Sequence, residues 1–146
     1  SKNKKIGISW HSQKESLLDK NIPFNDFLEC LPNKYDYYCI HKEINQEAED
    51  AIQAKSNIFY FRNQILDFSD TAAICSQMDT VITIDTSVAH LSPALGIETF
   101  ILLPYVPDWR WTIDLKIPVW YDNAYLVRQS KLGDWKNVLE YIKQNI

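Results

Sequence analysis

Glycine is scarce in this sequence, with three residues among 146. Phosphate-binding loops of the G-x-G-x-x-G kind and of the P-loop kind need several closely spaced glycines, so both motifs are excluded. Histidine is equally scarce, and no two of the three histidines have the spacing of metal ligands on one helix. We therefore expect no metal and no bound cofactor.

Cysteine, long apolar runs and positive charge are also limited. The three cysteines are odd in number and form no C-x-x-C pair, which favours reduced thiols and a cytoplasmic location. No apolar run approaches the roughly 18 residues of a membrane span. A net charge of −4 is atypical of nucleic-acid binders, which carry a basic surface. We expect no membrane span and no nucleic-acid partner.

Short apolar segments alternate with helical patterns along the whole chain. The expected strands are residues 5–10, 36–41, 57–61, 81–84, 99–103 and 124–127. The expected helices are residues 23–31, 46–55, 69–78, 88–95 and 134–145. This alternation predicts one α/β domain over residues 1–146, with a doubly wound, mostly parallel, Rossmann-like sheet of about six strands. The commonest strand order in such sheets is 3-2-1-4-5-6.

Polar residues follow the first and the fourth expected strands. Residues 10–14, from Trp10 to Lys14, come after the first strand, and residues 85–87 come after the fourth. In a doubly wound sheet the winding direction reverses between these two strands, and ligands bind outside their carboxyl ends. The two loops are therefore expected to meet at one binding site.

The segment Asp85-Thr86-Ser87 has two interpretations. Each of these residue types is a favoured helix N-cap, and a cap needs no further function. A helix N-terminus also binds anions through its backbone N–H groups. His90 follows in the first helical turn, where the helix dipole disfavours a positive charge, so we expect a neutral imidazole there.

Two further local features concern the helices. Ser69 or Asp70 is expected to cap the helix over residues 69–78. Pro93 is expected to kink the next helix or to restart it with Ser92 as a new cap. Gly96 follows where a left-handed C-terminal residue belongs.

Several motifs together resemble one known protein family. They are DFSDTAAICSQMDTVITIDTSVAHLSPALG (residues 67–96), LLPYVPDWRW (102–111), KIGISW (5–10), KNIPFNDFLECL (20–31), RQ (128–129) and GDW (133–135). The chain resembles the C-terminal half of the family 9, heptosyltransferase-like glycosyltransferases. Within that family it is most similar to the branch fused to tetratricopeptide repeats.

The resemblance implies the GT-B arrangement, in which two Rossmann-like domains face each other across a cleft. The C-terminal domain holds a nucleotide-diphosphate sugar, and a missing N-terminal domain supplies the acceptor pocket and the general base. Thr86 and Ser87 would present backbone N–H groups to the diphosphate. Asp85 and His90 would face the transferred sugar or the diphosphate as catalytic residues, and Lys14 would bind phosphate. The fragment alone is expected to be inactive.

Other residues keep open interpretations. Trp10 is expected to line the donor site, and Arg110 is expected to contact either a carboxylate or a donor phosphate. The segment 41–43 ends the second strand, where dinucleotide folds contact a ribose. Trp109, Trp111 and Trp120 are expected to form a packed aromatic plug. Two alternatives to the transferase stay open, namely a non-catalytic nucleotide-binding module and an interaction domain whose site has decayed.

Overall fold

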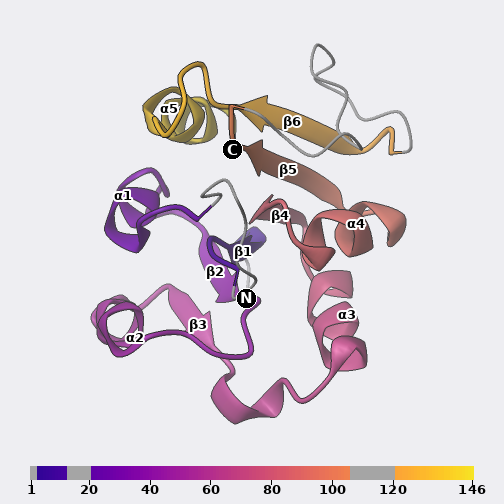
Figure 1. The fold of residues 1–146 in the computed structure, drawn as a ribbon. Coiled ribbons are helices and arrows are strands. Elements are labelled where there is room, and N and C mark those ends of the chain that lie inside the picture. The colour runs from indigo at the N-terminus through magenta and orange to yellow at the C-terminus, as the bar shows by residue number, and fades with distance from the viewer. Residues whose placement is uncertain (1–2, 13–20, 106–120) are drawn as a thin grey trace.

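A single six-stranded parallel sheet forms the centre of the molecule (Figure 1). The computed structural model describes residues 3–12, 21–105 and 121–146, and its strand order is β3-β2-β1-β4-β5-β6. The strands are β1 (Lys5–Ser9), β2 (Asp36–Cys39), β3 (Ile58–Tyr60), β4 (Thr80–Ile84), β5 (Glu98–Leu103) and β6 (Ala124–Arg128). This architecture and the expected strand order are confirmed.

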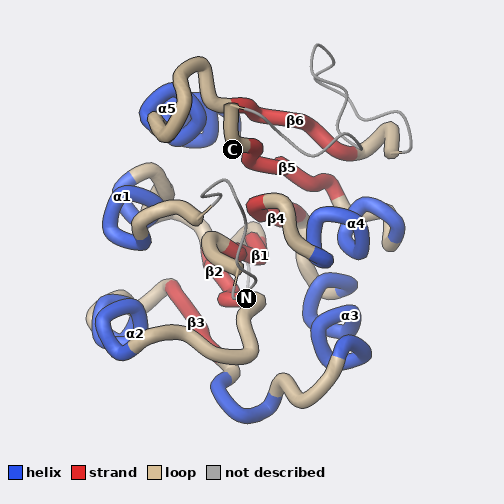
Figure 2. The backbone as a smooth tube through the Cα atoms, in the orientation of Figure 1, coloured by secondary structure: helices blue, strands red, loops and turns tan. Residues whose placement is uncertain are grey.

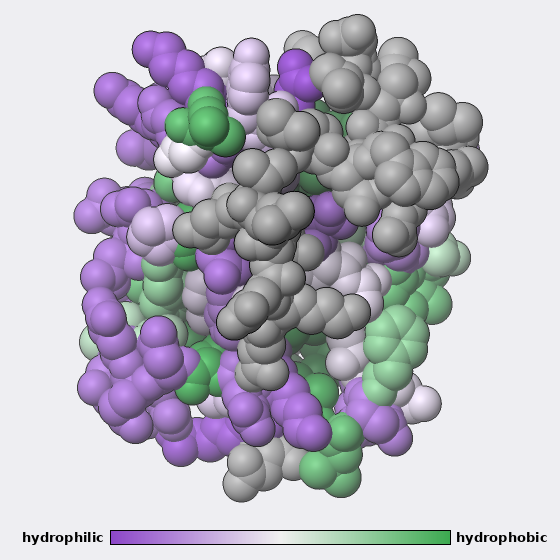
Figure 3. Space-filling view, viewed as in Figure 1, coloured by the Kyte–Doolittle hydropathy of each residue, from purple (hydrophilic) through white to green (hydrophobic). Residues whose placement is uncertain are grey.

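Helices cover both faces of the sheet, as the smooth tube of Figure 2 shows. They are α1 (Phe24–Glu29), α2 (Gln46–Gln53), α3 (Phe68–Ser76), α4 (Ser87–Ala94) and α5 (Lys136–Asn145). Helices α1, α2 and α5 lie on one side, and α3 and α4 lie on the other (Figure 1). The side of α1, α2 and α5 is largely hydrophilic at the surface (Figure 3).

The central strands are buried because both of their faces are covered. Every residue of β4 is buried, which explains its continuous run of apolar and β-branched residues. In β1, a Cβ added at Gly7 would meet Ile40 Cδ1 and approach Met78 Cγ to 3.2 Å. Glycine at this position therefore allows Ile40 and Met78 to pack closely against β1.

Helix α3 begins earlier than the sequence indicates. Its N-cap is Asp67, whose side chain accepts a hydrogen bond from the backbone N–H of Asp70 at 3.1 Å. The Asp70 carboxylate in turn accepts from the backbone N–H of Asp67, which completes a capping box. The expectation that Ser69 or Asp70 is the cap is therefore wrong, because the carboxylate that reaches the open N–H lies three residues before it.

Helix α4 is continuous through Pro93 and does not restart there. Pro93 lies in the last turn, so the backbone hydrogen bond that it removes is close to the helix end. Ser92 is fully buried, and its hydroxyl pairs with that of Thr99 at 2.9 Å instead of capping a new helix. Gly96 has the expected left-handed conformation, with φ of 81°. Pro93 consequently leaves the first turn of α4 unchanged.

Candidate functional site

The carboxyl ends of β1 and β4 are neighbours in the sheet. Ser9 pairs with Thr83 in parallel register. Continued by two residues, this register brings His11 level with Asp85. The loops that begin after Ser9 and after Ile84 therefore start side by side at the edge where the winding reverses, as expected.

The first turn of α4 begins at this edge of the sheet. Thr86 is the N-cap and is extended, with φ of −132° and ψ of −178°, but its side chain makes no capping hydrogen bond. Its hydroxyl lies 3.4 Å from that of Thr83 instead. Within the described chain, the N–H groups of Ser87 and Val88 have no acceptor. This arrangement is suited to an anion.

The capping alternative therefore fails for Thr86, although this residue occupies the cap position. By contrast, Asn45 caps α2 by accepting from the Ala48 N–H at 2.8 Å, and Asp67 caps α3. An uncapped helix start leaves donors that water or a ligand must satisfy.

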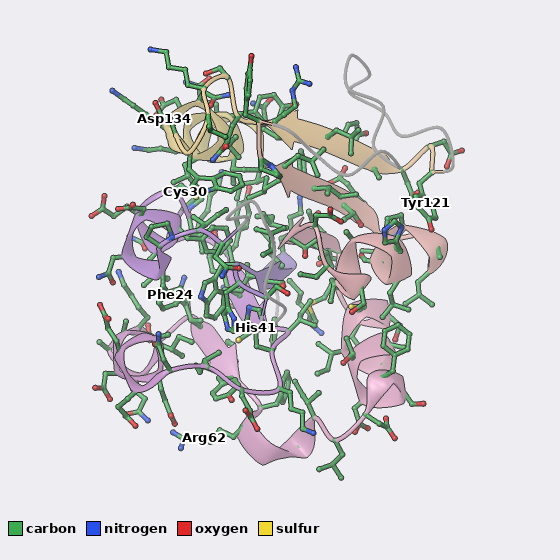
Figure 4. The ribbon with its side chains drawn as sticks, viewed as in Figure 1. Phe24, Cys30, His41, Arg62, Tyr121 and Asp134 are labelled. Atoms are coloured by element: carbon green, nitrogen blue, oxygen red, sulfur yellow. The ribbon has the colours of Figure 1, made fainter. Side chains whose placement is uncertain are left out.

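His90 and Asp85 lie on either side of this turn, and both are partly buried. The His90 ring centroid is 6.1 Å from that of Tyr121, which is labelled beside α4 in Figure 4. His90 is the fourth residue of α4, and Asp85 directly precedes the cap. The structure thus brings a carboxylate, two open N–H groups and an imidazole to one helix start.

Trp10 lies in the hydrophobic core beneath the carboxyl edge of the sheet. Its side chain is 3% exposed and belongs to the main core, where its ring stacks on Phe24 at a centroid distance of 4.3 Å. Its N–H donates to His41 Nε2, and its carbonyl accepts from the Ile22 N–H. These bonds take Trp10 out of the β1 ladder, so the strand ends one residue earlier than expected.

Some expected site residues lie outside the described residues. They are Lys14, Arg110, Trp109, Trp111 and Trp120. The phosphate-binding role of Lys14 and Arg110 stays a prediction, and so does the aromatic plug.

A second group of side chains lies where β1 and β2 end. The rings of His11 and His41 stack at a centroid distance of 4.0 Å, and His41 is labelled in Figure 4. Because His41 Nε2 accepts from the Trp10 N–H at 3.1 Å, the His41 ring is neutral with its proton on Nδ1. Burial lowers the pKa of His41 well below its usual value, and the adjacent His11 lowers it further.

His11 is the more accessible member of this pair. Burial lowers its pKa, and a hydrogen bond with the backbone of Glu43 opposes that shift. Its Nε2 is buried and has no hydrogen-bond partner among the described residues. The sequence analysis missed this pairing because it depends on the register of β1 and β2, in which Ile8 pairs with Cys39, and the apolar pattern does not specify that register.

A cavity of about 630 Å³ opens beside this pair, between the starts of α1 and α2. Aromatic and acidic side chains line it, among them Trp10, Phe24, Glu43 and Glu47. Asn25 reaches across it to Glu47, with Nδ2 and Oε1 at 3.5 Å. The cavity therefore adjoins the carboxyl edge of the sheet on its α1 and α2 side.

The described residues hold neither a cluster of metal ligands nor a helix that could span a membrane. Residues 3–12, 21–105 and 121–146 contain no cluster of three or more histidines, cysteines or acidic residues arranged to hold a metal ion. No helix in the same ranges has both the length and the apolar character required to cross a membrane.

The fold is shared with solved glycosyltransferases. The chain superimposes on the E. coli heptosyltransferase WaaC, solved with ADP-2-deoxy-2-fluoro heptose, with a TM-score of 0.70 and 12% identity over 99% of this chain. The E. coli ADP-heptose lipopolysaccharide heptosyltransferase II gives a TM-score of 0.68 with 17% identity over 99% of this chain. WaaC with ADP gives a TM-score of 0.65 with 12% identity over 98% of this chain.

The chain spans less than half of these proteins, covering 44% of WaaC and 46% of heptosyltransferase II. No protein-family model and no curated protein matches the sequence. At these identities the comparison establishes the common Rossmann-like fold.

Proposed function

We propose that this domain binds the nucleotide-diphosphate sugar of a glycosyltransferase at the carboxyl ends of β1 and β4. The observation that carries the proposal is the uncapped first turn of α4, which begins where the sheet reverses its winding and whose Ser87 and Val88 N–H groups have no acceptor among the described residues. Helix N-termini at this place in doubly wound sheets are suited to phosphate groups.

Each residue at the turn then has a distinct role. The N–H groups of Ser87 and Val88 bind diphosphate oxygens, and Thr86 holds the chain extended ahead of them. The expectation that the Thr86 N–H binds diphosphate is wrong, because this N–H donates to the Ile84 carbonyl at 2.8 Å. Asp85 and His90 flank the turn and face the transferred sugar. The helix dipole and charge-assisted hydrogen bonds stabilise the diphosphate as it leaves, so no metal ion is required for that step.

Transfer also needs an acceptor hydroxyl and a base that removes its proton. Asp85 lies beside the diphosphate rather than opposite it, so the base comes from another part of the protein. We assign that part to an N-terminal acceptor domain in a GT-B arrangement, because the chain covers under half of the heptosyltransferases it superimposes on. We also propose that the whole protein belongs to the branch fused to tetratricopeptide repeats, because the sequence motifs resemble that branch. This chain alone binds the donor without transferring sugar.

Substitution of Ser87 tests the backbone contact directly. Proline is tolerated at the first helical position, and the extended Thr86 before it suits proline as well. Ser87→Pro therefore removes one N–H donor with little change in fold, whereas Ser87→Ala removes only the hydroxyl. We expect calorimetric titration with ADP, UDP and GDP to find a ligand whose affinity falls about 10-fold in Ser87→Pro, the equivalent of about 1.4 kcal/mol.

Ser87→Ala is the matched control for Ser87→Pro. Ser87→Ala should bind that nucleotide within about threefold of the wild-type chain, because its backbone N–H is intact. Flat titrations with all three nucleotides at millimolar concentration would contradict the proposal. Equal affinity of Ser87→Pro and the wild-type chain would show that the nucleotide binds elsewhere.

A further inference from the structure

The carboxyl edge of the sheet holds a cation that the site described above does not use. Arg128 is the last residue of β6, and Leu103 of β5 pairs with it. Because Ile84 pairs with Leu102, Asp85 is level with Leu103 and therefore with Arg128. Two strand spacings, about 10 Å, separate the backbones of Asp85 and Arg128.

The side chain of Arg128 is directed to the face of the sheet that α4 covers. Residues Ala124 and Leu126 of β6 pack with Ala89 of α4 in one cluster. Side chains alternate along a strand, so Arg128 is the next member of that series. The start of α4 and the guanidinium of Arg128 consequently share one edge and one face of the sheet.

The guanidinium contacts an aromatic ring, and no carboxylate among the described residues neutralises its charge. Its Cζ lies 6.0 Å from the ring centroid of Tyr105, which follows the end of β5. The Arg128 carbonyl accepts from Asn137 Nδ2 at 3.0 Å, which fixes the backbone. No carboxylate in the described ranges lies within ion-pair distance of this side chain.

The neighbouring glutamine ties the two loops of this edge together. Gln129 is 1% exposed, and its Oε1 accepts from the N–H groups of Tyr105 and Gly133 at 3.0 and 3.2 Å. Both acceptances use the oxygen, so Nε2 is left as a buried donor, and no acceptor for it exists among the described residues. A buried donor without an acceptor is typical of a place that a ligand or water completes.

We infer that Arg128 binds the phosphate oxygens of the ligand whose diphosphate lies at the start of α4. Tyr105 positions the Arg128 side chain, and Gln129 connects the loops on either side of it. The inference rests on the proposed function, which it extends by one named residue. A guanidinium presents paired N–H donors that match phosphate oxygens, whereas the α4 start supplies only backbone N–H groups. The two together supply backbone donors and a positive charge to one diphosphate.

The test measures binding of ADP and of inorganic pyrophosphate to wild-type chain and to three variants by calorimetry. We expect Arg128→Gln to weaken both ligands by about 10- to 100-fold, by a similar factor for each, because the lost contact is with phosphate. Arg128→Lys keeps the charge but lacks the planar pair of N–H donors, so its affinity for both ligands should lie between those of the wild-type chain and Arg128→Gln. Lys131→Gln, an exposed cation on the same loop, is the control and should bind within twofold of wild type.

The outcomes separate the two proposals. Unchanged affinity of Arg128→Gln for both ligands would overturn the inference while leaving the nucleotide site standing. Equal losses in Arg128→Gln and Lys131→Gln would overturn it as well, since only the overall charge would then matter. If pyrophosphate binds in a way that depends on Arg128 but ADP does not bind, the phosphate-binding role of Arg128 is supported and the nucleotide proposal is refuted. A wild-type chain that binds neither ligand refutes both.

Discussion

His41 shows how one buried side chain fixes the end of a strand. Its ring accepts the Trp10 N–H that would otherwise continue the β1 ladder, and it stacks on His11. An imidazole can accept at Nε2 only while that nitrogen is unprotonated. The geometry at the carboxyl end of β1 therefore depends on a neutral His41.

The stability of the chain should accordingly depend on pH below about 6.5, the ordinary pKa of a histidine. The pKa of His41 in the folded chain is lowered, so below about pH 6.5 the unfolded chain binds a proton that the folded chain does not. The free energy of unfolding should thus be retained above pH 6.5 and fall as the pH drops, by at most about 1.4 kcal/mol per pH unit for this group. Urea unfolding at several pH values measures the slope.

The matched variants isolate this histidine. His41→Gln can still accept the Trp10 N–H but does not titrate, so its slope should be shallower than that of the wild-type chain. Lys42→Gln, at the exposed next position, should keep the wild-type slope. Identical slopes for His41→Gln and the wild-type chain would contradict this account.

Helix starts differ in whether the side chain at the N-cap position closes them. The starts of α2 and α3 are closed by side chains of Asn45 and Asp67, whereas the N-cap side chains of α1, α4 and α5 make no capping hydrogen bond. Among these three, α4 is the helix that follows β4, at the point where the sheet reverses its winding. Sequence patterns predicted all five helices, because apolar spacing determines where a helix packs. They did not predict the ends of α3, because the choice among several capping residue types depends on which side chain reaches the open N–H.

The capping box of α3 is expected to contribute measurably to stability. Asp67→Ala removes the acceptor for the Asp70 N–H and should lower the free energy of unfolding by about 1 kcal/mol. Ser69→Ala changes another candidate cap residue that makes no capping bond, and its effect should stay within about 0.5 kcal/mol. Chemical denaturation measures the free energy of unfolding of both variants. An equal decrease in the two would contradict the assignment of Asp67 as the cap.

At the scale of the whole molecule, the winding of the sheet was the most predictable feature. Strand order and the meeting of the first and fourth loops followed from the alternation of strands and helices, and both are confirmed. Contacts between residues distant in sequence were not predictable. The stacking of His11 on His41 and the approach of Arg128 to Tyr105 depend on register and on side-chain direction, which the apolar pattern does not specify.

The burial of the three cysteines is also a property of the whole fold. All are free and buried, as the odd number and wide spacing indicated. Burial raises the pKa of Cys30 to about 12 and that of Cys75 to about 11, so the reactive thiolate is scarce near neutral pH. These thiols contribute to packing rather than to chemistry.

The central claim is that a diphosphate binds at the open start of α4. The most direct measurement is a titration of the ¹⁵N-labelled chain with ADP, followed through its backbone amide resonances. We expect the largest saturable shifts at Ser87 and Val88, whose N–H groups have no acceptor in the described chain, with smaller shifts at His11 and Ser12 on the adjacent strand end. Saturable ADP binding that leaves the Ser87 and Val88 amides unmoved would contradict the account.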